Sequence, residues 1–138
     1  MVVRLIIAVA ALSFTCQADA RTIQKIVILE TGLNKNPDEY GLSEACKKFK
    51  PTVRQVKEFF TKAYIVPHRF SLHERYAPCY ATGTLEFSDF GKVEWVLSSG
   101  GTGSISWDEG ENVFLYYRGY KWLDPTACSY GLGDVLDC

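Results

Sequence analysis

The sequence predicts an α+β domain: an antiparallel β-meander of about four to five strands packed by one face on one main amphipathic helix. Two observations predict it. Apolar residues recur at helical spacing in residues 51–66, and they alternate with polar residues in four segments between residues 80 and 120. Short, turn-rich connections separate these segments, which is typical of consecutive antiparallel strands. No repeat or linker divides the chain, so one domain is expected.

The first twenty residues have the pattern of a secretory signal peptide. Arg4 supplies a positive charge, residues 5–14 form an apolar run, and the sequence Ala-Asp-Ala at residues 18–20 fits a signal-peptidase site. We therefore expect a single secreted or periplasmic domain spanning residues 21–138. The apolar run is too short for a stop-transfer helix, so no integral membrane segment is expected after cleavage.

Two alternatives to cleavage and secretion remain at the N-terminus. One is lipid anchoring through Cys16, and the other is an uncleaved anchor. Lipoprotein sites need small residues before the acylated cysteine, whereas this chain has the bulky Phe14 there. The sequence therefore favours a cleaved signal peptide.

The cysteines of the mature chain predict two disulfides. An even number of cysteines in a short exported domain indicates structural bridges. The two closest cysteines are ten residues apart and no Cys-x-x-Cys occurs, so a metal site is not expected. Three pairings are possible, and proximity in sequence favours Cys46 with Cys79 and Cys128 with Cys138. Each bridge typically contributes about 2–4 kcal/mol.

The first half of the mature chain predicts a strand, a loop and a short helix. Residues 25–32 are apolar and β-branched and end in a glycine, which is typical of a strand. Residues 33–41 have loop composition. Residues 42–49 predict a short helix capped by Ser43. Its inward side chains are expected to be Leu42, Cys46 and Phe49.

Residues 51–66 predict the main helix. Thr52 and Gln55 have capping-box spacing, although Pro51 can alternatively occupy the first helical position. Pro67 ends the helix. The side chains expected to face the core are Val53, Val56, Phe59, Phe60 and Ala63. Those expected to face solvent are Arg54, Lys57, Glu58 and Lys62.

Residues 80–87, 92–99, 103–107 and 112–120 predict the remaining four strands. Their alternation assigns one apolar face to the core, where the main helix covers it. The members of that face are Ala81, Gly83, Leu85, Phe87, Val93, Trp95, Leu97, Ile105, Trp107, Val113, Leu115 and Tyr117.

Residues 114–122 place five aromatic rings in nine positions. If the last strand continues past Gly119, Tyr116, Tyr120 and Trp122 share the outer sheet face with serine and threonine side chains. Such a mixed surface suits a protein or carbohydrate ligand. Alternatively, the C-terminal tail or the first strand covers Phe114 and Tyr116 as a second layer of core.

The candidate binding surface combines this stripe with two hairpin turns. Its members are Tyr116, Arg118, Tyr120, Lys121, Trp122, Ser98, Ser99, Thr102, Asp108, Glu109 and Glu111.

The charge distribution is uneven although the net charge is only −1. Residues 47–75 hold eight basic residues and two acidic ones. This segment either steers an acidic partner or is an ordinary solvated helix face. Because the chain is exported and not basic overall, a nucleic-acid partner is not expected.

The sequence lacks the common signatures of catalysis. Neither a GxSxG nor an HExxH motif occurs, and oxidised cysteines cannot act as nucleophiles. The acidic residues at positions 108–111 belong to a hairpin turn, and the glycine-rich residues 98–103 precede no helix that could bind phosphate. We therefore expect no catalytic residues, no cofactor and no metal ion.

These features predict a small exported cell-envelope protein that binds another protein. In size, export and layout the chain resembles periplasmic immunity proteins and inhibitors of cell-wall hydrolases. If the protein binds its partner as such an inhibitor does, residues 98–102 or 108–111 would insert into the partner's cleft. The alternative is a glycan or small-ligand module that uses the aromatic and Ser/Thr sheet face, or a pocket lined by rings between helix and sheet. A structural accessory without a dedicated site is the third possibility.

Overall fold

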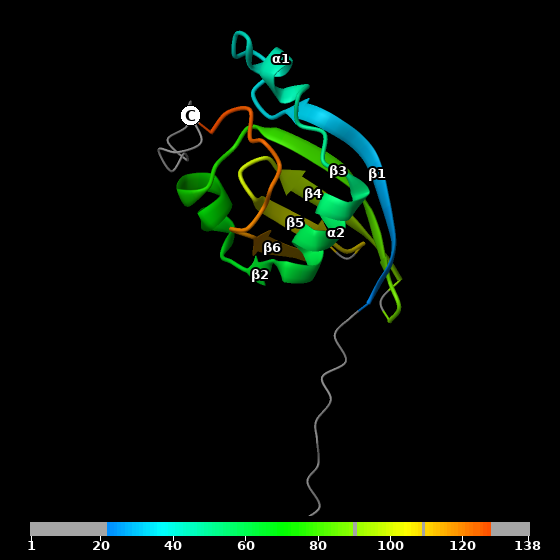
Figure 1. The fold of residues 1–138 in the computed structure, drawn as a ribbon. Helices are drawn as coiled ribbons and strands as arrows, with labels where there is room; N and C mark the ends of the chain where they lie inside the picture. The colour runs from blue at the N-terminus through cyan, green and yellow to red at the C-terminus, as the bar shows by residue number, and fades with distance from the viewer. Residues whose placement is uncertain (1–21, 90, 109, 128–138) are drawn as a thin grey trace, which may run out of the picture.

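A computed structural model describes residues 22–89, 91–108 and 110–127 (Figure 1). The expected signal peptide, Cys128 and Cys138 lie outside these residues. The elements, in chain order, are β1 (Ile23–Asn34), α1 (Leu42–Cys46), α2 (Val53–Lys62), β2 (Tyr64–Ile65), the π-helical turn η1 (Phe70–Glu74), β3 (Cys79–Phe87), β4 (Gly91–Ser98), β5 (Thr102–Ser106) and β6 (Asn112–Tyr116).

The strands form one antiparallel sheet in the order β1-β3-β4-β5-β6-β2. The α+β class and the consecutive meander from β3 to β6 are confirmed. The sequence predicts too few strands, because the helix it predicts over residues 51–66 includes the two residues that form β2. Ala63 already has an extended backbone, and Tyr64 and Ile65 then pair with Tyr116 and Leu115.

Helix α2 begins as the sequence predicts. The Thr52 side chain accepts a hydrogen bond from the Gln55 amide, and the Gln55 side chain accepts one from the Thr52 amide. Val56 and Phe59 are fully buried against the sheet. The inward assignment of Val53 is wrong: it lies in the first turn, beyond the part of the helix that the sheet covers, and is 52% exposed.

Helix α1 is joined to the sheet by a disulfide between Cys46 and Cys79, the first residue of β3. This pairing is confirmed. The second expected bridge, Cys128 with Cys138, falls outside the described residues. The expected cap at Ser43 is wrong: Gly41, in the left-handed conformation, precedes the helix, and the Ser43 hydroxyl instead accepts a hydrogen bond from Asn34.

The core lies between the sheet and α2, and it is built around Trp95 of β4. This side chain is 1% exposed and packs on Phe60 at 5.8 Å between ring centroids. Gly83, its cross-strand partner, leaves room for the ring: a Cβ there would come within 2.5 Å of the indole. The rings that could have lined a pocket therefore fill the space between helix and sheet.

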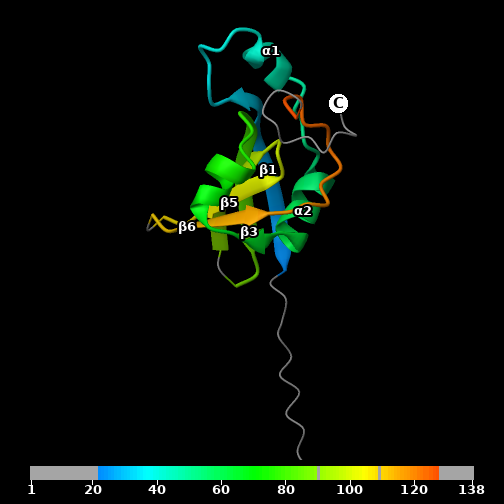
Figure 2. The ribbon, with the colours of Figure 1, turned by 90° about the vertical axis from the view of Figure 1, so that its left-hand side faces the viewer.

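The opposite sheet face is covered at one side by residues 66–76, which include η1. Figure 2 shows this segment and α2 on opposite sides of the sheet. The ring of His68 stacks on Phe114 at 4.1 Å, and Phe70 packs on Tyr116 at 4.9 Å. The Arg75 guanidinium lies over the Tyr116 ring at 5.5 Å. A second layer does cover these aromatics, and residues 66–76 provide it; the tail beyond residue 127 lies outside the described residues.

The last strand is shorter than predicted, since β6 ends at Tyr116. Residues 117–127, here called the strap, turn away from the sheet edge and run beside α2 on the same side of the sheet (Figures 1 and 2). Tyr120 and Trp122 therefore do not continue the outer-face stripe. The outer face loses the two rings that a longer strand would have placed there.

We expect Trp95→Ala to lower the free energy of unfolding by about 3–5 kcal/mol, because it empties the centre of the core. Trp107→Ala should cost clearly less, since Trp107 is only half-buried at the end of β5. Urea unfolding followed by circular dichroism measures both. Equal losses in the two variants would contradict this account of the core.

Candidate functional site

The strap is anchored to the hairpin between β4 and β5. The Tyr117 amide donates to the carbonyl of Gly101 at 3.0 Å, and Trp122 Nε1 donates to the carbonyl of Ser99 at 2.8 Å. The Ser99 hydroxyl donates to Asp124 Oδ1 at 2.8 Å. Three contacts spread along the strap thus fix its path over a turn that is itself buried.

Asp124 organises the end of the strap. Its Oδ1 also accepts hydrogen bonds from the amide and the hydroxyl of Thr126, each at 2.9 Å. Asp124 is 8% exposed and Thr126 is 2% exposed. The three hydrogen bonds to Oδ1 tie the strap to the hairpin, whereas the second carboxylate oxygen, Oδ2, is buried without a hydrogen-bond partner among the described residues.

Trp122 attaches the strap to the core. Its ring lies 5.9 Å from Phe49 and 6.2 Å from Phe59, and it stacks on Tyr120 at 4.9 Å. Tyr120 in turn covers Gly101, where a Cβ would lie 2.5 Å from the tyrosine ring. The stripe of aromatic residues is thus mainly an anchor, and its two last rings are half-buried.

Side chains between these anchors point to solvent. Arg118 and Lys121 are exposed, and Leu123 is 71% exposed although it follows the half-buried Trp122 directly. The anchored backbone thus presents two cations and a large apolar side chain to solvent; arginine and, at the centre, apolar groups are enriched in protein interfaces.

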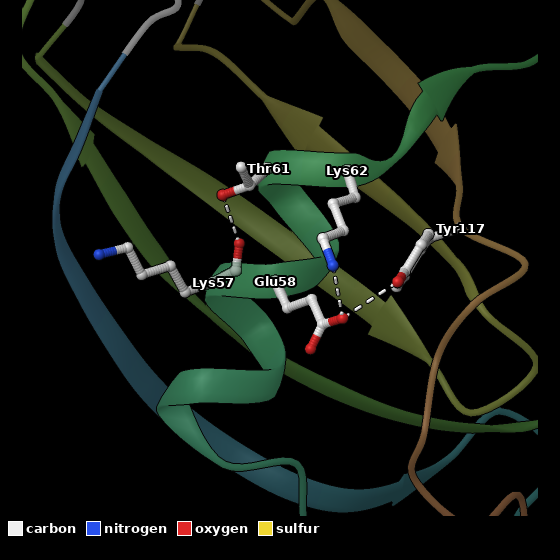
Figure 3. Close-up of polar contacts among 5 residues, drawn as sticks. All are labelled: Lys57, Glu58, Thr61, Lys62 and Tyr117. Atoms are coloured by element: carbon white, nitrogen blue, oxygen red, sulfur yellow. Dashed lines mark hydrogen bonds and ion pairs between the residues drawn. The ribbon is translucent and has the colours of Figure 1, made fainter.

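A polar cluster connects the strap to α2 (Figure 3). Glu58 Oε1 accepts hydrogen bonds from Lys62 Nζ and from the Tyr117 hydroxyl, both at 3.0 Å. The hydrogen bond from Lys62, then that from Tyr117, lowers the pKa of Glu58, and the positive charge of Lys121 contributes. The same contact with Glu58 raises the pKa of Lys62.

The outer side of α2 is basic. Arg54, Lys57 and Lys62 are exposed along it, and Lys50 precedes the helix. Glu58 is the one acidic residue of α2, and it is engaged by Lys62 and Tyr117. In Figure 3 Lys57 points away from this cluster, and no described carboxylate forms an ion pair with it or with Arg54.

Several residues of the predicted binding surface are buried. Ser98 donates to the carbonyl of Ala77, Ser99 lies under the strap, and Thr102 pairs with Tyr116 in the sheet. These side chains cannot form an exposed surface, because the strap and residues 66–77 cover them. Their exposed fractions are 3% for Ser98, 0% for Ser99, 3% for Thr102 and 4% for Tyr116.

The acidic turn between β5 and β6 stays open to solvent. Asp108 and Glu111 are exposed, and Glu109 lies outside the described residues. Figure 2 shows this hairpin projecting on the side of the sheet opposite α2. The structure thus separates the predicted surface into two regions: Arg118, Lys121 and the half-buried rings on the strap side, and the acidic turn on the other side.

The sequence pattern does not predict that the apolar side chains of Val53 and Leu123 are exposed. Val53 has helical spacing with the core residues, and only the depth to which α2 is buried shows that it faces solvent. Leu123 follows an aromatic residue and precedes a loop, so no periodic signal marks it. The exposure of both depends on tertiary packing.

Within the described ranges, no group of three or more His, Cys, Asp or Glu side chains is arranged to hold a metal ion. Among the same residues, no helix is both long and apolar enough to cross a membrane. No protein family, curated protein or solved structure matches this chain.

We expect Gly101→Ala to destabilise the domain by roughly 1–3 kcal/mol, because Gly101 has a φ of 86° and Tyr120 lies over it. Gly110→Ala is the matched control: its φ is 80° with no atom within 4 Å, so it tests backbone strain without the clash. Thermal unfolding should show a larger loss for the Gly101 variant, and equal losses in the two variants would contradict the contact between Tyr120 and Gly101.

The link between strap and helix should depend on pH. The folded pKa of Glu58 is lowered from 4.5, so its stabilising contribution is complete above that pH and is lost as the pH falls through the folded pKa. Glu58→Gln should therefore be less stable than wild type at neutral pH, and the difference should shrink in acid. Urea unfolding at a series of pH values measures this difference. A stability difference between wild type and Glu58→Gln that stays constant as the pH falls would contradict this dependence on Glu58.

Proposed function

We propose that this chain is a small exported, non-catalytic domain of the cell envelope that binds another protein, in the manner of an immunity protein or an inhibitor. The observation that carries the proposal is the strap. Its backbone is fixed by Gly101, Ser99 and the packing of Trp122, while Arg118, Lys121 and Leu123 extend outward.

The anchoring matters for affinity. A loop that is ordered before binding loses less conformational entropy in the complex than a free loop does. Inhibitors commonly use this principle, since their interface backbone moves little on binding. The strap is attached at its start, middle and end, and it leaves Leu123 at 71% exposure for a partner.

In this proposal the glycine-rich turn does not insert into the partner's cleft. Residues 98–102 are buried under the strap, so they act as its support. The glycan alternative loses much of its basis, because residues 66–76 cover the aromatic rings of the outer sheet face. The strap is therefore the contact element that we favour.

The proposal is tested by affinity capture with the oxidised mature domain, in parallel with a Leu123→Ala variant. We expect one stoichiometric protein partner that is lost or weakened by about tenfold in the variant, because a few side chains buried at the centre of an interface carry most of the binding free energy. Leu29→Ala is the control, since Leu29 is also highly exposed, at 64%, but lies on β1.

Circular dichroism must show that both variants stay folded. Equal retention of the partner by wild type and Leu123→Ala would exclude the strap as the contact. Retention of cell-wall fragments with no protein would instead support the glycan alternative.

A further inference from the structure

We propose that the partner presents an acidic protein surface, which docks across the strap and the outer side of α2 together. This inference rests on the proposed function and names the chemistry of its partner. The residues that would meet the partner form a basic face, defined here as Lys50, Arg54, Lys57, Lys62 and Lys121.

The charges of the basic face are available to a partner. All five side chains are exposed, and among the ion pairs of the described residues only Lys62 takes part, with Glu58. Arg54 and Lys57 are one turn apart on α2, which brings their Cβ atoms to roughly 5–6 Å. Like charges at this spacing repel each other slightly, and an incoming carboxylate relieves that repulsion.

Glu58 offsets one charge of the basic face, that of Lys62, and the other four charges have no ion-pair partner among the described residues. Glu58 accepts hydrogen bonds from Lys62 and Tyr117, and this same contact holds the start of the strap beside the helix. The helix and the strap thus form one continuous surface. Lys121 is exposed on the strap, which runs beside α2 (Figures 1 and 2), so the basic face extends from the helix onto the strap.

Exposed apolar side chains on α2 and on the strap favour a protein over a simple polyanion. Val53, in the first turn of α2, is 52% exposed, and Leu123 on the strap is 71% exposed. A polyphosphate has no apolar group on which these side chains could pack. A protein surface that carries carboxylates around apolar residues satisfies both kinds of contact.

The other side of the molecule also has an exposed apolar side chain, Leu29, but its charges are arranged differently. On the outer face of the sheet, Lys25 and Lys92 lie opposite Glu86 in the strand register, so positive and negative charges alternate there. Lys25 and Lys92 therefore serve as a control. Replacing both with glutamate changes the net charge as much as the test variant does, but away from the basic face.

The test measures binding of a synthetic peptide rich in aspartate and glutamate with interspersed leucines. Fluorescence anisotropy is recorded at about 10 mM and about 150 mM NaCl, where the Debye length is about 30 Å and about 8 Å. We expect Arg54→Glu/Lys57→Glu to weaken binding at least about tenfold, and salt to weaken wild-type binding. Lys25→Glu/Lys92→Glu should bind like wild type.

Polyphosphate and phosphatidylglycerol vesicles are measured in the same way. A clear preference for either probe over the peptide would overturn the inference in favour of a polymer or a lipid surface. So would absence of peptide binding at low salt, or equal losses in the two double variants. Leu123→Ala changes no charge, so failure of the strap proposal and failure of the acidic-partner inference are distinguishable.

Discussion

The burial of Phe59 is the contact on which the arrangement of this domain depends. Its ring is fully buried at the point where α2, β5 and the strap meet. It lies against Gly103, where a Cβ would come within 2.8 Å of it, and its centroid is 6.2 Å from that of Trp122. One side chain thus positions the helix on the sheet and supplies the surface on which the strap is held.

The strap links stability to the candidate site. Its anchors are buried groups such as Ser99 and Asp124, whereas Lys121 and Leu123 between and beside them are free to contact a partner. Because the hydrogen bonds of the anchors are made within the domain, the exposed side chains need contribute little to folding. Such a division lets a binding surface vary without loss of the fold.

The two sides of the sheet have different physical characters. The side with α2 and the strap carries the basic face, while the other side is covered in part by residues 66–76 and otherwise shows alternating charges and hydroxyl groups. Aromatic packing around Tyr116 closes the region that a glycan-binding sheet would have used. The candidate binding surface therefore lies on the side of the sheet that carries α2 and the strap.

The sequence by itself determined the α+β class, the capped helix α2, the strands β3 to β6 and the Cys46–Cys79 pairing, because periodicity, capping and turn residues are local signals. It could not show that β6 stops at Tyr116, that Ser99 is buried or that Val53 and Leu123 are exposed. Those outcomes depend on contacts between distant segments: the strap with the hairpin at Gly101, and residues 66–76 with the outer face. Alternation assigns a side chain to a face, but only tertiary packing decides whether another segment covers that face.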